Sequence, residues 1–458
     1  MKDGVCPTGI AGLDEVLGGG FPRGSIVLVA GTPGAGKTTM AARFVYEGLR
    51  RGEPGVYLSF MESKQDFVKF MKLLGMDFTP YLRDGSFRFI EGIQSTSFEA
   101  AKENLMEFLK AVSDVKAKRV VIDSVTAITQ MTTLRGAREL IKNALVIGLR
   151  PYEVTGIVVA ELPIGYEIVG YGLEEFIFDG VIILKSEFRN GILRRTLQVR
   201  KMRGTSIPEV ELHYDIVTGE GIRVYVPIRV EERGALREGY VTPLKPFDTL
   251  FGSIRRGSQI LLYVDKFTPS LAVGVLAGLA FVHSSGGKLI IRSFSKPPTI
   301  VRHVIDMLTE VLPTRRSDAE VIVECLNPTQ EPLYRIAHRS RDHESSLRPD
   351  YVVIDPLSQI VRLSGDMNDF YRDHINNLLL RRKLGITTFY TYIDDGNPEN
   401  KPPLELYDLT IVIKGEWAGG RRCFAAEPHG IAADALGKPL KLCIEGRPFR
   451  LALKGDEV

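Results

Sequence analysis

The eight residues from Gly31 to Thr38, GTPGAGKT, have the types and spacing that bind the phosphates of a nucleoside triphosphate. They match G-x-x-x-x-G-K-[ST], a loop whose glycines let successive backbone N–H groups turn toward an anion. In such a loop Lys37 would reach the β and γ phosphates, and the Thr38 hydroxyl would ligate Mg²⁺. The candidate nucleotide-binding residues are Gly31, Thr32, Pro33, Gly34, Ala35, Gly36, Lys37, Thr38 and Thr39.

The elements on either side of this loop are those that the chemistry requires. Residues 26–30 form an apolar, partly β-branched run that predicts a buried strand. Residues 39–49 carry apolar side chains at helical spacing, so a helix should follow the loop directly. The positive end of that helix would add to the attraction for phosphate.

Two carboxylates are candidates for completing such a site. Asp123 ends the apolar run 119–123 and would hold Mg²⁺ together with Thr38, although strands also end in Asp that caps the next helix. Glu62 follows the probable strand 56–61, at the sheet edge where ligands bind. It would polarise the attacking water, or else begin a helix as an exposed acidic residue.

Length and composition restrict the class of protein. The 458 residues are too many for one ordinary core, and the net charge of +3 gives no support for wholesale nucleic-acid binding. Four scattered cysteines lack metal-ligand spacing and suggest reduced thiols. The longest apolar run, 271–282, is too short to span a bilayer, and no signal-peptide pattern opens the chain. We therefore expect a cytoplasmic protein without a membrane segment.

The two halves of the chain repeat the same landmarks in the same order. Segments 9–25, 57–60, 119–124 and 178–185 are echoed by 246–258, 291–294, 351–356 and 407–414. In each half, short apolar runs alternate with amphipathic helical stretches, which favours an α/β fold with a mostly parallel sheet flanked by helices. We predict a first domain at 1–228, a linker at 229–242 and a second domain at 243–458.

The second copy differs where the chemistry would occur. Residues 264–271, VDKFTPSL, align with the phosphate loop but contain no glycine. Lys266 is expected to be a solvated surface lysine, and Asp355, which matches Asp123, to be a helix cap. Lys296 stands where Glu62 stands in the first half. The second domain should keep the fold without the nucleotide site.

These motifs, with KMRGT at 201–205, resemble the KaiC family of RecA-superfamily ATPases, including archaeal KaiC-like proteins. Segments 8–14, 62–66 and 172–176 also look like that family. The resemblance implies tandem RecA-like domains that bind ATP and Mg²⁺ and form a homo-oligomeric ring, a hexamer, with ATP held between neighbouring subunits. It covers the first domain by specific motifs and the second by order and pattern.

The resemblance also implies roles for individual residues. Glu62 matches the second of two catalytic glutamates, and Met61 stands at the first. Lys201 and Arg203 match basic residues that reach the neighbour's γ phosphate, although an ordinary basic pair on an edge strand has the same pattern. The clock protein of that family phosphorylates itself on adjacent Ser and Thr residues in its second domain. The matching stretch here, 404–408, lacks them, so a clock-type autokinase cycle is not expected.

Three functions remain open from the sequence. The leading hypothesis is an ATPase of regulatory or signalling type, whose second domain contacts an unknown protein partner. A non-catalytic, ATP-gated scaffold is the second hypothesis. The third is a RadA/RecA-like DNA recombination factor, but segments 127–136 and 162–178, where DNA loops would lie, carry few positive charges.

Overall fold

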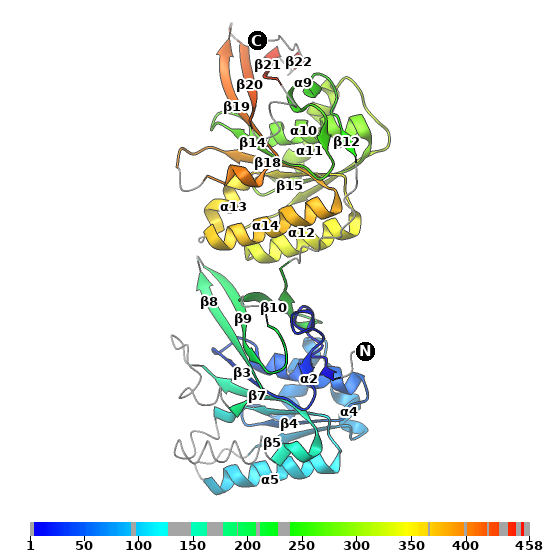
Figure 1. The fold of residues 1–458 in the computed structure, drawn as a ribbon, viewed down its shortest axis with the longest axis vertical. Coiled ribbons are helices and arrows are strands. Elements are labelled where there is room, and N and C mark those ends of the chain that lie inside the picture. Colours follow the sequence, from blue (N-terminus) through cyan, green and yellow to red (C-terminus); the bar gives the residue numbers. More distant parts are fainter. Residues whose placement is uncertain are drawn as a thin grey trace. The chain divides into compact units, whose positions relative to one another are not determined.

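The computed structural model describes residues 4–92, 98–126, 148–162, 177–189, 191–207, 211–227, 239–364, 367–397, 401–418, 421–429, 438–445 and 450–452. The chain divides into two compact units, Met1–Val226 and Pro227–Val458 (Figure 1). Each unit has its own nine-stranded sheet. The predicted α/β class with two mostly parallel, helix-flanked sheets is confirmed.

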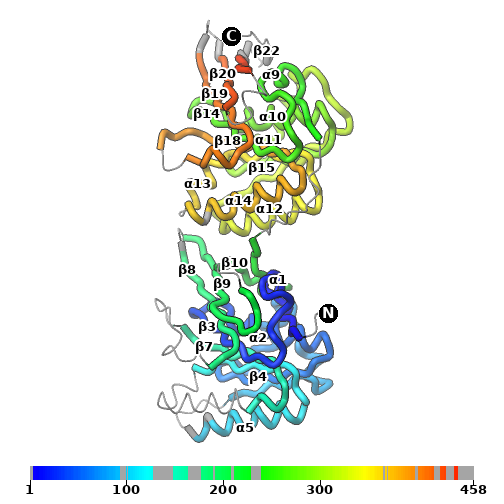
Figure 2. The backbone as a smooth tube through the Cα atoms, in the orientation of Figure 1, coloured from blue at the N-terminus to red at the C-terminus, as the bar shows by residue number. Residues whose placement is uncertain are grey.

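The first unit is built on a sheet with the strand order β11-β10-β9-β8-β3-β7-β6-β4-β5. Its strands are β3 (Ile26–Gly31), β4 (Gly55–Ser59), β5 (Phe87–Glu91), β6 (Arg119–Asp123), β7 (Thr155–Glu161), β8 (Gly180–Arg189), β9 (Ile192–Met202), β10 (Leu212–Val217) and β11 (Gly221–Tyr225). The strands from β8 to β5 are parallel, whereas β9, β10 and β11 continue the sheet in antiparallel fashion. Figure 2 shows β8 and β9 running side by side as a long hairpin.

Helices cover both faces of this sheet. They are α1 (Leu13–Val16), α2 (Lys37–Arg50), α3 (Lys64–Leu73), α4 (Thr79–Arg83) and α5 (Phe98–Asp114), with a 3₁₀ turn at Arg150–Tyr152. Every residue of β3 is buried because alternate side chains face α2 on one side and the α5 core on the other. A small ladder, β1 (Val5–Cys6) with β2 (Phe21–Pro22), precedes the sheet.

The second unit repeats this order strand for strand, as β22-β21-β20-β19-β14-β18-β17-β15-β16. The strands are β14 (Gln259–Val264), β15 (Gly287–Ser293), β16 (Ala319–Cys325), β17 (Tyr351–Asp355), β18 (Thr387–Ile393), β19 (Leu409–Ala418), β20 (Arg421–His429), β21 (Leu440–Glu445) and β22 (Arg450–Ala452). The helices are α9 (Phe247–Phe251), α10 (Ser270–Ser285), α11 (Pro298–Val311), α12 (Leu333–Leu347), α13 (Leu357–Ser364) and α14 (Met367–Leu384), with a 3₁₀ turn at Leu404–Leu406.

Three further observations bear on the sequence-based expectations. Most of the predicted 229–242 linker lies outside the described residues, but its end forms β12 (Tyr240–Val241), which pairs with β13 (Ile254–Arg255) in the second unit. Cys423 is disulfide-bonded, so the expectation of four reduced thiols is wrong. Its backbone partner across β20 and β21 is Cys443, a neighbour that only strand pairing reveals. Among the described helices, none is long and apolar enough to cross a membrane.

Candidate functional site

The glycine-rich segment forms the turn between β3 and α2. Gly34 and Gly36 have positive φ angles of 75° and 89°, which residues other than glycine rarely adopt. Gly36 is the N-cap of α2 and supplies no side chain to the first-turn N–H groups, so these donors are available to an anion. Within the segment, Pro33 and Gly34 are exposed, whereas Gly31, Ala35 and Thr39 are buried.

Lys37 lies across its own loop. Its Nζ donates hydrogen bonds to the carbonyl oxygens of Gly31, at 3.0 Å, and Thr32, at 3.1 Å. Burial lowers the pKa of Lys37, and the negative charges of Glu161 and Asp123 partly offset that effect. The two carboxylates favour the charged form of Lys37, and a cation held at the loop can bind phosphate oxygens.

Thr38 and Asp123 meet although 85 residues separate them in sequence. The Thr38 Oγ1 donates to Asp123 Oδ2 at 2.7 Å. Asp123 is buried, and burial raises the pKa of its carboxyl, while hydrogen bonds from Thr38 and Tyr57 and the charge of Lys37 lower it. Because the Thr38 proton is directed at the carboxylate, the hydroxyl lone pairs are left for a metal ion, and this donor set fits Mg²⁺.

Glu62 follows β4 and faces the same region. Its Oε2 is buried and has no hydrogen-bond partner among the described residues. Burial raises the pKa of Glu62, and the charges of Asp123 and Asp66 raise it further. Ser63 is the N-cap of α3 and accepts a hydrogen bond from the N–H of Asp66 at 3.2 Å, so Glu62 lies one residue before the cap.

The structure separates Lys201 and Arg203 from this cluster within one chain. Lys201 lies near the end of β9, and Arg203 lies just beyond it. At this end of the strands Gly180 of β8 pairs with Val27 of β3. The phosphate loop begins after Gly31, at the other end of β3, where Gly31 pairs with Leu184. Four residues of strand correspond to about 13 Å.

Both cations are already engaged at that end of the sheet. Lys201 Nζ donates to the Phe178 carbonyl oxygen at 2.8 Å, and Arg203 Nη1 donates to Asp179 Oδ1 at 3.1 Å. Neither cation is therefore placed to reach the phosphate loop of its own unit.

Sequence reasoning missed residues that surround the loop. Glu161 ends β7 beside Gly31, and the rule that carboxyl ends of parallel strands share an edge could have found it. Tyr214 of β10 donates its hydroxyl to the Ala35 carbonyl oxygen, and Ile216 packs against Gly36. No local pattern in the sequence marks these last two contacts, because they come from the antiparallel end of the sheet.

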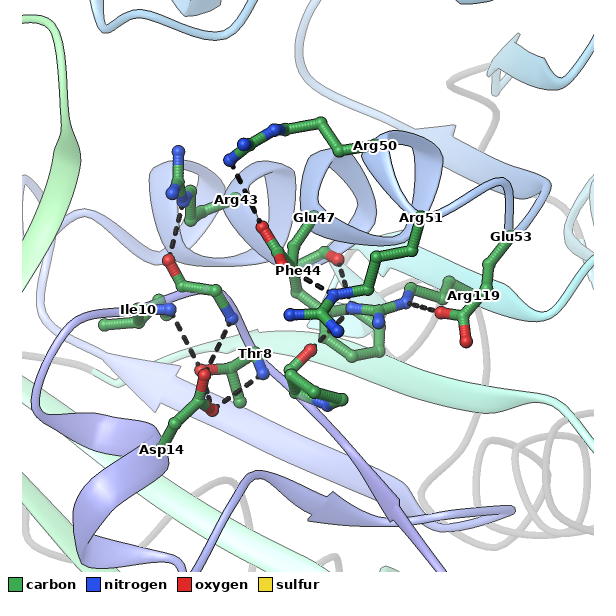
Figure 3. Close-up of polar contacts among 12 residues, drawn as sticks. Thr8, Ile10, Asp14, Arg43, Phe44, Glu47, Arg50, Arg51, Glu53 and Arg119 are labelled. Carbon is green, nitrogen blue, oxygen red and sulfur yellow. Dashed lines mark hydrogen bonds and ion pairs between the residues drawn. The ribbon is translucent and has the colours of Figure 1, made fainter. Parts of the chain in front are cut away.

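A buried arginine fixes the helix that carries Lys37 and Thr38. Figure 3 shows Arg119 of β6 reaching under α2 toward Glu53. Its guanidinium donates to Glu53 Oε2 and to the carbonyl oxygens of Pro7 and Phe44, each at 2.7 Å, and it lies 4.8 Å from the Phe44 ring centroid. The side chain has no exposed area, so among the described residues these partners, and not water, compensate its charge.

The opening segment is fastened to the same helix (Figure 3). Asp14 accepts hydrogen bonds from the Thr8 hydroxyl and backbone N–H, each at 2.7 Å, and from the Gly9 N–H at 3.1 Å. Arg43 Nε of α2 donates to the Gly9 carbonyl oxygen at 2.7 Å. The segment and α2 are therefore held as one layer behind the phosphate loop.

The second unit fills the corresponding place with its own side chains. Asp265 accepts hydrogen bonds from the N–H groups of Phe267, at 2.8 Å, and Gly415, at 2.6 Å, and from the Thr268 hydroxyl at 2.9 Å. A carboxylate therefore occupies two donors of this loop and one donor of β19. Lys266 is exposed, as expected.

Asp355 does not behave as the expected helix cap. It is fully buried at the end of β17, and its Oδ1 accepts a hydrogen bond from the Thr391 hydroxyl at 2.6 Å.

A parallel sheet of this order, with a glycine-rich phosphate loop facing a strand-end aspartate, defines a P-loop nucleotide-binding domain. The family described as the KaiC ATPase matches residues 6–228. The chain is 36% identical over 234 residues to a UPF0273 protein of Thermotoga maritima, covering 48% of this chain and 94% of that protein.

Two further relatives support the same assignment. A UPF0273 protein of Pyrococcus horikoshii is 35% identical over 249 residues, covering 50% of this chain and 97% of that protein. The circadian clock protein KaiC3 of Synechocystis sp. is 33% identical over 371 residues, covering 78% of this chain and 72% of that protein. The chain belongs to the KaiC ATPase family.

Proposed function

We propose that the first unit binds ATP and hydrolyses it with Mg²⁺. The observation that carries this proposal is the contact of Thr38 with Asp123, beside Lys37 and the unpartnered buried oxygen of Glu62. Residues 31–39 would hold the phosphates, and Thr38 and Asp123 would hold Mg²⁺. The metal would neutralise phosphate charge. Glu62 would orient the attacking water and accept its proton.

We further propose that the chain works as a homo-oligomeric ring, a hexamer. Lys201 and Arg203 lie near the Val27 end of β3, whereas their own phosphate loop follows the Gly31 end, which supports a role at a neighbour's site. A cation supplied in this way can accelerate phosphoryl transfer by about 10³–10⁵. The Asp179 and Phe178 contacts would keep both side chains ordered before assembly.

The second unit would serve as a platform for assembly and for a protein partner. Asp265 supplies an intramolecular anion in the loop that replaces the phosphate loop, which disfavours a triphosphate there. We infer a regulatory or signalling role in the cytoplasm. A clock-type autokinase cycle is disfavoured, since the only hydroxyl in 404–408, that of Tyr407, is buried against His374 Nε2 at 2.8 Å.

A specific observation favours the ATP-gated scaffold as a second candidate. Met61, which is 66% exposed, stands beside Glu62 where the resemblance implies a second catalytic glutamate, so one glutamate of that pair is missing. The DNA recombination hypothesis would need basic DNA-binding loops at 127–136 and 162–178, but these segments carry few positive charges, and most of their residues lie outside the described ranges. Salt-sensitive binding of single-stranded DNA by the purified protein would support it.

Steady-state ATP turnover by wild type and Glu62→Gln, with Mg²⁺ and without nucleic acid, tests the proposal. Loss of a general base should reduce turnover by about 10²–10⁴ while ATP binding persists. Lys37→Ala should lose ATP binding and ATP-dependent ring formation, measured by light scattering after size exclusion. Equal, negligible rates in wild type and Glu62→Gln despite ATP binding would favour the scaffold.

A further inference from the structure

Tyr57 is a buried polar residue to which the proposed chemistry assigns no role. It lies in the middle of β4 with no exposed area. Its hydroxyl donates a hydrogen bond to Asp123 Oδ2 at 2.8 Å. In the β4–β6 pairing Tyr57 is opposite Val121 and Ser59 is opposite Asp123, so the phenol reaches along the neighbouring strand to the carboxylate.

Two donors therefore converge on one oxygen of Asp123. Thr38 Oγ1 and the Tyr57 hydroxyl both donate to Oδ2, at 2.7 and 2.8 Å. Among the described residues, no donor is hydrogen-bonded to Oδ1. Two bonds from different elements, α2 and β4, fix the rotation of the carboxylate. They leave Oδ1 as the acceptor for a metal ion or for water bound to it.

The ring of Tyr57 is held independently of its hydroxyl. It is stacked on the ring of Phe89, with centroids 5.5 Å apart and an interplanar angle of 12°. Its centroid also lies 4.8 Å from that of the Phe67 ring. A phenylalanine at this position would keep these ring contacts. The hydroxyl can therefore be removed while the packing of the core is retained.

The second unit lacks this arrangement. Strand register matches Tyr57 with Ile291, which has no polar group, and Asp123 with Asp355. Asp355 is hydrogen-bonded instead by Thr391, on the other neighbouring strand, and by Ser270 at the start of α10. The tyrosine–aspartate bond thus occurs in the unit with the glycine-rich loop and is replaced in the other.

We propose that Tyr57 is a positioning residue for the Mg²⁺ site, holding Asp123 so that Oδ1 faces the metal ion. This inference rests on the proposed function of the first unit. Loss of an outer partner that orients a metal-ligating group typically costs 10–100-fold in metal affinity or activity. The nucleotide itself should be bound as before, since the hydrogen bond of the Tyr57 hydroxyl goes to the Asp123 carboxylate and not to the phosphate loop.

The test compares Tyr57→Phe with wild type in a binding assay. A fluorescent ADP analogue is titrated at a series of Mg²⁺ concentrations and again with EDTA. In Tyr57→Phe, the Mg²⁺ concentration that gives half of the maximal change in nucleotide affinity should rise by about 10–100-fold. Affinity measured in EDTA should stay within about twofold of wild type, and far-UV circular dichroism checks the fold.

The matched control is Thr391→Val, which removes the counterpart hydrogen bond to Asp355 in the second unit. It should leave the Mg²⁺ requirement unchanged. A folded Tyr57→Phe protein with the wild-type Mg²⁺ requirement would overturn the role of Tyr57 and leave the proposed function intact. If nucleotide binding by wild type itself does not respond to Mg²⁺, both the proposed metal site and this inference are wrong.

Discussion

Replacing Arg119 by methionine should destabilise the first unit strongly and leave the second unchanged. Methionine keeps much of the side-chain length but removes the charge that binds Glu53 and the carbonyl oxygens of Pro7 and Phe44, each at 2.7 Å. Removing one member of a buried ion pair typically costs about 3–5 kcal/mol, because the other charge is left uncompensated. With a urea slope of about 2–3 kcal/mol per molar, the midpoint should fall by about 1–2.5 M.

The single tryptophan makes the two units separately observable. Trp417 lies in β19, so its fluorescence reports unfolding of the second unit, whereas far-UV circular dichroism reports both. Arg119→Met should shift the circular dichroism transition and leave the fluorescence transition in place. Arg292→Met is the matched control, because Arg292 is buried in the second unit and donates to Glu344 at 2.6 Å. It should shift the fluorescence transition.

The pH dependence of this effect follows from Glu53. Burial alone would raise the pKa of Glu53, but the charge and hydrogen bond of Arg119, aided by Arg23, bring it below its usual value. A lowered folded-state pKa contributes stability that is present at neutral pH and lost as the pH falls through that pKa. The difference in the free energy of unfolding between wild type and Arg119→Met should therefore become smaller at acid pH. A loss below about 1 kcal/mol at neutral pH would refute the assigned role of the buried pair.

Three further perturbations test the site and its counterpart. Gly36→Ala places a Cβ 2.8 Å from Ile216 Cδ1 at a residue whose φ is +89°. The resulting strain of about 1–3 kcal/mol should weaken ATP binding about tenfold or more in a fluorescence titration. Wild-type ATP affinity in this variant would contradict the reasoning. Turnover should fall as the pH drops through the raised pKa of Glu62, at higher pH than for an ordinary glutamate, because a general base must be unprotonated. A rate that stays constant down to the usual glutamate range would argue against Glu62 as the base. Asp265→Asn should destabilise the second unit by about 1–2 kcal/mol, measured by the unfolding transition of Trp417 fluorescence, without changing ATP affinity. Binding of a second ATP per chain by this variant would show that the carboxylate alone blocks the loop at 264–271.

Local sequence patterns were sufficient for the fold class and for the family. The α/β alternation predicted two parallel sheets because burial on both faces requires continuous apolar runs such as β3. The assignments of Lys37, Thr38, Asp123 and Glu62 remain predictions, but the structure does bring these residues together. The rule that strand carboxyl ends share one edge is what made that meeting predictable.

Other parts of the site depend on contacts between distant segments. Tyr214 and Ile216 reach the phosphate loop only because β10 folds back along the sheet, and the disulfide at Cys423 depends on strand pairing. The sequence marked Lys201 and Arg203 as candidates but gave no indication that they lie at the opposite end of the sheet.

The sequence by itself determined what depends on short-range stereochemistry: a glycine loop that turns backbone N–H groups inward, the strand and helix on either side of it, and the loss of that loop in the second half. Only the tertiary structure decided which oxygen of Asp123 is occupied, which charge compensates Arg119, and which cations cannot reach their own loop. Those properties depend on strand order and register. Register is set by the packing of whole sheet faces, so no single motif encodes it.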